Sequence, residues 1–191
     1  MNAIRKSVSE PSHSDTDLLA FKFVESHELK IDSIKKLCPH LPTENEVFFM
    51  WAATSFNAFT FIPYMIKECG CIENLIISTY GLNARIIDAL CRYVDSGQIK
   101  QVSILISDSI KFRMPKVADL LKSVSDARNN FNICFAWNHS KVALIETTAG
   151  FFIVEGSGNW SENAKNEQYI FLNSRNVFDF RAKWILDEFN H

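Results

Sequence analysis

Residues 138–167 read NHSKVALIETTAGFFIVEGSGNWSENAKNE, and two apolar runs within them indicate how this part of the chain folds. The run VALI follows Lys141 and the run FFIV precedes Glu155, and each has the length of a buried strand. Residues 147–150 between them have the composition of a turn, so we expect a β-hairpin. The second strand ends in Gly-Ser-Gly-Asn at 156–159, where a backbone rich in glycine can approach an anion closely.

Polar side chains gather at one end of this hairpin. His139 and Lys141 are two positions apart on an extended segment, so their side chains point to the same face. An imidazole acts as a nucleophile or as a general acid and base near neutral pH, and a lysine supplies positive charge. Ser157, Asn159 and backbone N–H groups can bind phosphate oxygens. We therefore expect a phosphate-binding site here.

Neither half of this pattern is decisive by itself. A histidine at a strand end is commonly a hydrogen-bonded structural residue, and a Gly-Ser-Gly-Asn turn is commonly only a turn. The joint spacing of the two halves is what favours a site.

The same residues resemble a known family. His139-x-Lys141, four further residues to Glu146, and then Gly156-Ser157-x-Asn159 resemble the HKD motif of the phospholipase D superfamily, with Glu146 where the family usually has Asp. Asn163 and Glu167 match polar residues that often follow the motif. The resemblance covers residues 47–173 and is closest to short, single-motif members, which include phage proteins and homodimeric bacterial endonucleases.

The resemblance implies a mechanism without a metal or another cofactor. One histidine attacks phosphorus to form a phosphohistidine, and a second histidine protonates the leaving oxygen. This chain has a single His-x-Lys, so the resemblance implies a homodimer with one shared site. Glu167 would fix the imidazole tautomer. The residues implied are His139, Lys141, Asn159 and Glu167 as catalytic, Ser157, Gly156 and Gly158 as phosphate-binding, and Glu146 and Asn163 as supporting.

Strand and helix patterns alternate before the hairpin. We expect further strands at 47–52, 75–80, 102–107, 131–137 and 168–172, and helices at 56–67, 83–95, 115–128 and 177–189. This alternation predicts an α/β fold with a mixed, mostly parallel central sheet and helices on both faces, which is the phospholipase D-like fold that the resemblance implies. Sites in such sheets lie outside the carboxyl ends of strands, where His139 follows Trp137.

The rest of the chain suggests three parts. Residues 1–15 have the composition of a disordered tail, 16–46 are expected to form an N-terminal extension, and 47–191 the phosphodiesterase domain. The sequence has no run of eighteen apolar residues and no apolar stretch at its start. We expect a cytoplasmic protein without stable membrane insertion.

Composition limits the choice of partner. The formal net charge is −2, which is not the strongly basic balance of a tight duplex binder. Affinity for a phosphate backbone would have to come from a local patch, such as the basic run at 111–116, which could equally be a solvated loop. Cys69-Gly-Cys71 lacks a partner pair at zinc spacing, so the five cysteines are read as free thiols.

Aromatic residues are expected mainly in the core. This applies to seven phenylalanines, Phe48, Phe49, Phe56, Phe59, Phe61, Phe151 and Phe152. Trp160, directly after Asn159, could either stack on a base or cover the hairpin.

The functional prediction is a metal-independent phosphodiesterase, with nuclease activity as first choice. A phospholipase or another lipid phosphodiesterase is an alternative with the same chemistry, and it would need an interfacial binding surface. A third reading is a non-catalytic nucleic-acid-binding protein, which the acidic net charge and Glu146 support.

Overall fold

The computed structural model describes residues 30–52, 56–161 and 166–190. Asn163, the expected tail at 1–15 and the first part of the N-terminal extension lie outside the described residues. Residues 30–37 of the extension are helical, and Ile31 and Ile34 in this helix are buried in the main core.

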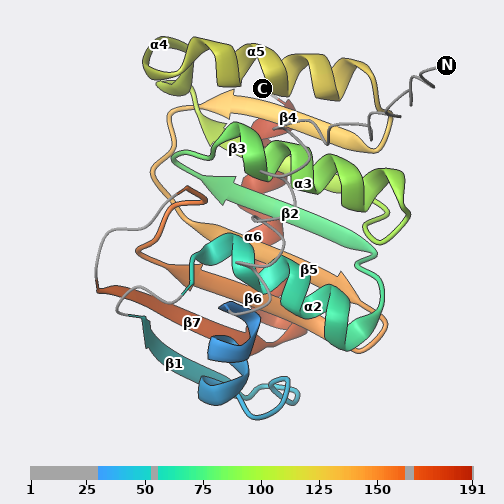
Figure 1. Ribbon diagram of the computed structural model, residues 1–191, viewed down its shortest axis with the longest axis vertical. Helices are drawn as coiled ribbons and strands as arrows, with labels where there is room; N and C mark the ends of the chain where they lie inside the picture. Colours follow the sequence, from blue (N-terminus) through green and yellow to red (C-terminus); the bar gives the residue numbers. More distant parts are fainter. Residues whose placement is uncertain (1–29, 53–55, 162–165, 191) are drawn as a thin grey trace, which may run out of the picture.

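The described residues form one seven-stranded sheet with the order β1-β7-β6-β5-β2-β3-β4 (Figure 1). The strands are β1 (Val47–Ala52), β2 (Asn74–Thr79), β3 (Val102–Ser107), β4 (Phe131–Ala136), β5 (Val142–Thr147), β6 (Gly150–Gly156) and β7 (Glu167–Asn173). Each expected strand is present, and Thr147 pairs with Gly150 across the expected hairpin turn.

The expectation of a mostly parallel sheet is wrong, although the sheet is mixed as predicted. Parallel pairing is confined to β2 with β3 and β3 with β4, while the other four pairs are antiparallel. The reason lies in the connections. A parallel pair needs a crossover of a dozen or more residues, which α3 and α5 supply, whereas β5 and β6 follow one another through a tight turn.

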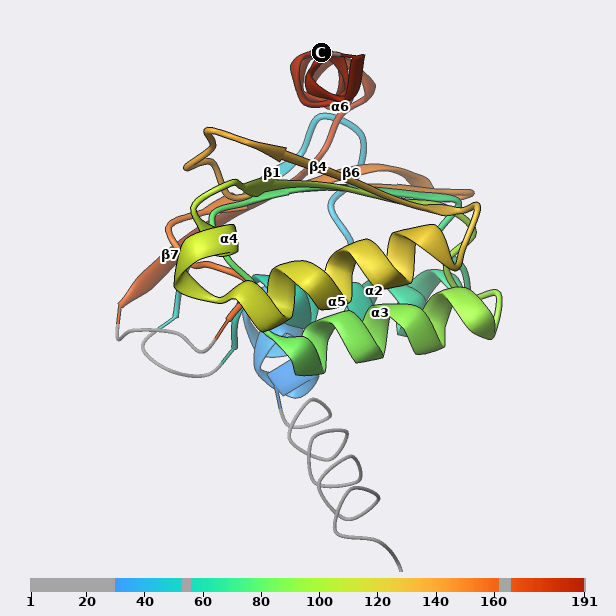
Figure 2. The same ribbon diagram turned by 90° about the horizontal axis from the view of Figure 1, so that it is seen from above.

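Helices cover both faces of the sheet, as expected. They are α2 (Phe61–Cys69), α3 (Ala84–Asp95), α4 (Ile110–Arg113), α5 (Pro115–Asp126) and α6 (Arg175–Asp187), with short 3₁₀ turns η1 (Ala58–Thr60) and η2 (Glu188–Asn190). Figure 2 shows α2, α3 and α5 on one side of the sheet and α6 alone on the other. Asn83 caps α3 by accepting a hydrogen bond from the Ile86 N–H at 3.1 Å, and Pro115 begins α5.

Each face of the sheet has its own apolar core, because neighbouring side chains on a strand point to opposite faces. Ile77 of β2 packs with the three-helix side, and the adjacent Ile76 packs under α6 with Leu144 and Ile153. Phe178 and Ile185 are the buried residues of α6. All six residues of β3 are buried, so this strand lies within the sheet and between both layers.

The structure decides between the two roles considered for Trp160 and corrects the expected burial of Phe49. Trp160 is 0% exposed and packs edge-on against Phe59 with ring centroids 6.0 Å apart, so it covers the hairpin and is not available to stack on a base. Phe49 is 77% exposed, and the expectation that it lies in the core is wrong. It belongs to the edge strand β1, where Met50 and Ala52 face the core and alternate residues face solvent. The other six phenylalanines are buried or pack against the core.

One buried amide holds the strand ends that lead to the expected site. The Asn138 Nδ2 donates to Ser78 Oγ at 2.9 Å and also reaches the carbonyl oxygens of Thr79 and Leu105 at 3.2 and 3.3 Å. Its Oδ1 accepts from the N–H and hydroxyl of Ser140 at 2.9 and 2.8 Å. A single side chain therefore ties the ends of β2 and β3 to the segment that carries His139.

The contrast between two tryptophans is testable. Trp160→Ala should lower the free energy of unfolding by about 3–5 kcal/mol, because it empties a fully buried site. Trp137→Ala should change it by less than about 0.5 kcal/mol, because Trp137 is 96% exposed. Urea denaturation followed by circular dichroism measures both. Equal effects for the two variants would contradict this assignment of burial.

Replacing Asn138 by Ala should also destabilise the protein, by about 2 kcal/mol, because it leaves buried donors and acceptors without partners. Asn176→Ala at the exposed start of α6 is the matched control and should stay within about 0.5 kcal/mol of wild type. The same denaturation experiment compares them. A neutral Asn138→Ala would mean that the amide does not hold the strand ends.

Candidate active site

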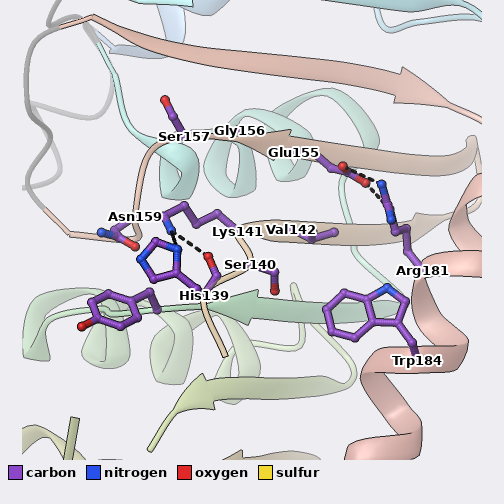
Figure 3. Close-up of a pocket in the computed structure, with 11 residues that line it drawn as sticks. His139, Ser140, Lys141, Val142, Glu155, Gly156, Ser157, Asn159, Arg181 and Trp184 are labelled. Carbon is purple, nitrogen blue, oxygen red and sulfur yellow. Dashed lines mark hydrogen bonds and ion pairs between the residues drawn. The ribbon is translucent and has the colours of Figure 1, made fainter. Parts of the chain in front are cut away.

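His139 and Lys141 lie in the segment that joins β4 to β5, and their side chains meet as expected. Lys141 Nζ is 3.4 Å from His139 Nδ1 and donates a hydrogen bond to the His139 carbonyl oxygen at 2.8 Å (Figure 3). The segment is not itself a strand, although the Lys141 carbonyl oxygen accepts a hydrogen bond from the Gly156 N–H of β6 at 3.3 Å. The contact between the two side chains places them on one side. The pair sits beyond the carboxyl end of β4, where sequence reasoning placed it.

An aromatic ring supports the imidazole. The ring of Tyr80, directly after β2, lies against His139 with centroids 4.7 Å apart, and the Lys141 Nζ is 5.8 Å from the same ring. The Arg113 guanidinium at the end of α4 lies 4.3 Å over the ring of Tyr80. Sequence reasoning missed Tyr80, although its position at the carboxyl end of a predicted strand was a usable signal.

Ser157 and Glu167 are held together on the opposite side of the site. The Ser157 hydroxyl donates to Glu167 Oε2 and accepts from the Gln168 N–H at 3.1 Å. The Ser157 N–H in turn donates to the Gln168 carbonyl oxygen at 3.1 Å. The structure therefore places Glu167 against Ser157, whereas we expected it against an imidazole nitrogen.

The glycine before Ser157 is needed for close packing. A Cβ on Gly156 would lie 2.3 Å from the Gln168 carbonyl oxygen and 2.6 Å from a ring carbon of Tyr169. Any side chain here would force β6 away from β7 and would displace Ser157. Gly158 is buried in the same turn.

Asn159 brings an unpaired polar atom to the site. Its Oδ1 is buried without a hydrogen-bond partner among the described residues, and Figure 3 shows its side chain beside His139. A buried acceptor in this state is costly, so it calls for a ligand. Rotating the amide by half a turn presents an N–H group in the same place, which suits a phosphate oxygen.

These side chains open into one pocket of about 680 Å³ on the α6 side of the sheet. Its lining consists of Tyr80, His139, Ser140, Lys141, Val142, Glu155, Gly156, Ser157, Asn159, Arg181 and Trp184. The far wall comes from α6, where Arg181 donates to Glu155 Oε2 at 3.0 Å and Trp184 lies beside this ion pair (Figure 3). Sequence reasoning missed this wall, because α6 follows the motif in the chain and reaches the pocket only through tertiary packing.

The electrostatics of the pocket centre on Lys141. Burial lowers the pKa of Lys141 below its usual 10.5, and the negative charges of Glu167 and of an ionised Tyr80 act in the opposite direction. The fold therefore holds a partly desolvated ammonium beside His139. Arg181 contributes less free charge, because Glu155 neutralises it.

Three of the expected residues, Glu146, Gly158 and Glu167, are not among the residues that line the pocket. Glu146 lies near the other end of β5, opposite Asn74 and Phe151, so it is about 16 Å along the strand from Lys141. Its carbonyl oxygen accepts a hydrogen bond from the Glu73 N–H at 2.8 Å. It can support the sheet but cannot touch a ligand at His139.

No cluster of three His, Cys, Asp or Glu that could hold a metal occurs within 30–52, 56–161 and 166–190. The cysteines there are free thiols, as expected. No helix in that part of the chain is both long and apolar enough to span a bilayer.

Comparison with known proteins gives a consistent structural result. Neither a protein-family model nor a curated protein sequence matches the chain. Nuc from Salmonella typhimurium, a phospholipase D family member, superposes with a TM-score of 0.56 and 15% identity over 76% of this chain and 94% of Nuc. Polyphosphate kinase from Porphyromonas gingivalis superposes with a TM-score of 0.54 and 18% sequence identity. The match covers 74% of this chain and 26% of the kinase. Phosphatidylserine synthase from Haemophilus influenzae superposes with a TM-score of 0.53 and 8% sequence identity. The match covers 76% of this chain and 39% of the synthase.

A further match covers more of the chain. TrmBL2, an archaeal chromatin protein with a novel mode of DNA binding, superposes with a TM-score of 0.51 and 11% identity over 92% of this chain and 64% of TrmBL2. At such identities the shared property is the backbone arrangement. The mixed sheet, the helices on both faces and the likeness to Nuc show that the chain has the fold of the phospholipase D superfamily.

Proposed function

We propose that the protein is a metal-independent phosphodiesterase that cleaves nucleic acid through a phosphohistidine on His139. The observation that carries this proposal is the contact between His139 and Lys141 at 3.4 Å in a pocket that Ser157 and Asn159 also line. The pocket therefore combines a candidate nucleophile and a positive charge with polar side chains that can bind phosphate oxygens. The superposition on Nuc, a phospholipase D family member, supports this reading.

The imidazole nitrogen that attacks would be Nε2, which is not in contact with Lys141. This requires the tautomer that carries its proton on Nδ1, with the Lys141 ammonium donating to the His139 carbonyl oxygen at 2.8 Å. In the first step the Nε2–P bond forms, the ester P–O bond breaks, and the leaving oxygen takes a proton from a second imidazole. In the second step that imidazole takes a proton from water, the water oxygen attacks phosphorus, and the Nε2–P bond breaks. The phosphomonoester then leaves, and both imidazoles are restored.

The second imidazole comes from a second copy of the chain. The other histidine within the described ranges, His40, packs against Phe48 in β1 with centroids 5.4 Å apart. Phe48 pairs with Phe171, near the end of β7 that is remote from Glu167, so His40 cannot reach the pocket. A two-fold homodimer would bring two His139 side chains to one shared site.

Charge stabilisation without a metal would come from side chains. Two Lys141 ammonium groups, one from each copy, would face the equatorial oxygens of the transition state, together with Ser157 and an Asn159 amide. Glu167, held by Ser157, would balance the charge of Lys141.

We take nucleic acid as the preferred substrate class, and the fold shared with TrmBL2, an archaeal chromatin protein that binds DNA, supports this choice. The likeness to phosphatidylserine synthase keeps a lipid phosphodiester as the second candidate. A non-catalytic nucleic-acid-binding role is the third.

Cleavage of labelled single- and double-stranded DNA and RNA in EDTA tests the activity. Wild type should cleave at least one of them, and His139→Ala should lose at least about 10³-fold in rate while keeping its circular dichroism spectrum, since the nucleophile is gone. An active His139→Ala would remove His139 from the mechanism.

Co-expression of differently tagged wild-type and His139→Ala chains in equal amounts tests the shared site. Random pairing leaves about a quarter of dimers with two intact histidines, so activity should fall to about a quarter of the all-wild-type value. A fall to about one half would mean that each chain acts alone.

The lowered pKa of Lys141 predicts a pH effect with a definite sign. The folded protein releases this proton at a lower pH than the unfolded chain, which releases it near 10.5. As the pH rises toward 10.5, the free energy of unfolding of wild type should therefore increase relative to Lys141→Gln, while turnover falls because the ammonium is lost. Urea denaturation and rate measurements across this range provide both readings. A pH-independent difference in stability would contradict the buried-ammonium assignment.

A further inference from the structure

The described residues expose two aromatic side chains close to the site. Trp137 is 96% exposed and Phe112 is 87% exposed, the highest values among the large hydrophobic side chains of that part of the chain. Trp137 comes directly after β4 and two residues before His139, and Phe112 lies in α4. Exposed aromatic side chains in such a position indicate a binding surface.

Cationic and aromatic groups connect this region to His139. Arg113 lies 4.3 Å over the ring of Tyr80 and donates to the Tyr80 carbonyl oxygen at 3.4 Å. Tyr80 in turn lies 4.7 Å from His139. The guanidinium, the phenol ring and the imidazole therefore form a continuous line that ends at the proposed nucleophile.

The end of β4 carries the outer part of the same surface. The Asp108 N–H donates to the Ala136 carbonyl oxygen at 2.9 Å, which fixes the start of the α4 region beside Trp137. Lys111 Nζ lies 4.7 Å over the ring of Phe135 in β4. Figure 1 shows α4 at the end of the sheet to which β2, β3 and β4 point. We name Tyr80, Lys111, Phe112, Arg113 and Trp137 the strand-end strip.

We propose that the strand-end strip binds single-stranded nucleic acid and guides one phosphate to His139. Bases would stack on Trp137, Phe112 and the outer face of the Arg113 guanidinium, and Lys111 and Arg113 would contact phosphates. A single strand exposes the faces of its bases, whereas a duplex stacks them inside, so flat exposed rings select the single strand. This inference rests on the proposed function and specifies its substrate class.

Exposed aromatic and basic residues also occur where proteins bind lipid surfaces. Two observations favour nucleic acid. Arg113 is already held flat on Tyr80, which presents a planar cation for stacking. The pocket that the strip leads to also has charged side chains on two walls, Lys141 on one and the ion pair of Arg181 with Glu155 on the other, which suit a charged ligand better than an acyl chain.

Binding is measured by the fluorescence anisotropy of a short labelled oligonucleotide, in EDTA and in a His139→Asn background that does not cleave it. Single-stranded DNA or RNA should bind more tightly than a duplex of the same sequence. Adding Trp137→Ala should weaken single-strand binding at least about fivefold, the loss of one stacked base. Trp51→Ala, an exposed tryptophan on the opposite edge strand, is the matched control and should leave binding unchanged.

Two further variants separate stacking from charge. Phe112→Ala should weaken binding, whereas Phe180→Ala, an exposed phenylalanine of α6, should not. Arg113→Gln should lower the slope of log affinity against log salt by about 0.7, the value of one lost phosphate contact on a single strand.

The outcomes separate binding by the strand-end strip from the proposed cleavage reaction. Unchanged single-strand binding in Trp137→Ala and Arg113→Gln would overturn the strip, even if wild type cleaves nucleic acid. Flotation with phosphatidylglycerol vesicles that depends on Trp137, together with no single-strand binding, would also overturn it in favour of a lipid surface. Strip-dependent binding with no cleavage by wild type would support the strip and reject the proposed reaction.

Discussion

The buried amide of Asn138 is the constraint on which the site depends. It contacts β2, β3 and Ser140 at once, so the segment that carries His139 cannot shift without breaking several hydrogen bonds in a place closed to water. Parallel strands β2, β3 and β4 deliver their carboxyl ends to this edge, and the hairpin returns Lys141 and Ser157 to it. His139 and Lys141 thus stand on a rigid base, which the proposed role of His139 as nucleophile requires.

The site itself carries electrostatic costs that the fold does not relieve. Burial lowers the pKa of Lys141, and Asn159 Oδ1 has no partner among the described residues. A bound phosphodiester would place a negative charge beside the partly buried Lys141 ammonium and give the Asn159 amide an oxygen to contact. Such local conflicts are typical of functional sites, because the rest of the chain follows the ordinary rules of packing.

The aromatic residues around the site divide into structural and exposed groups. Trp160 packs against Phe59 next to the Gly-Ser-Gly-Asn turn, and its backbone N–H donates to the Gly81 carbonyl oxygen at 3.2 Å. No other part of the described structure covers the side chain of Trp137, which is almost fully exposed to solvent. Trp137 directly follows an apolar strand and Trp160 follows a polar turn, so the local sequence alone would not indicate that the first is exposed and the second is buried.

The sequence by itself determined the features that arise from nearby residues. The hairpin, the shared face of His139 and Lys141, and the cap of α3 follow from strand periodicity and turn chemistry, which act over a few residues. The tertiary structure decided which strands are neighbours and in which direction, so it corrected the expected parallel sheet and moved Phe49 to a solvent-facing edge. It also brought Arg113 and Arg181 to the site, because contacts between distant segments depend on how whole layers pack and leave no local signal in the chain.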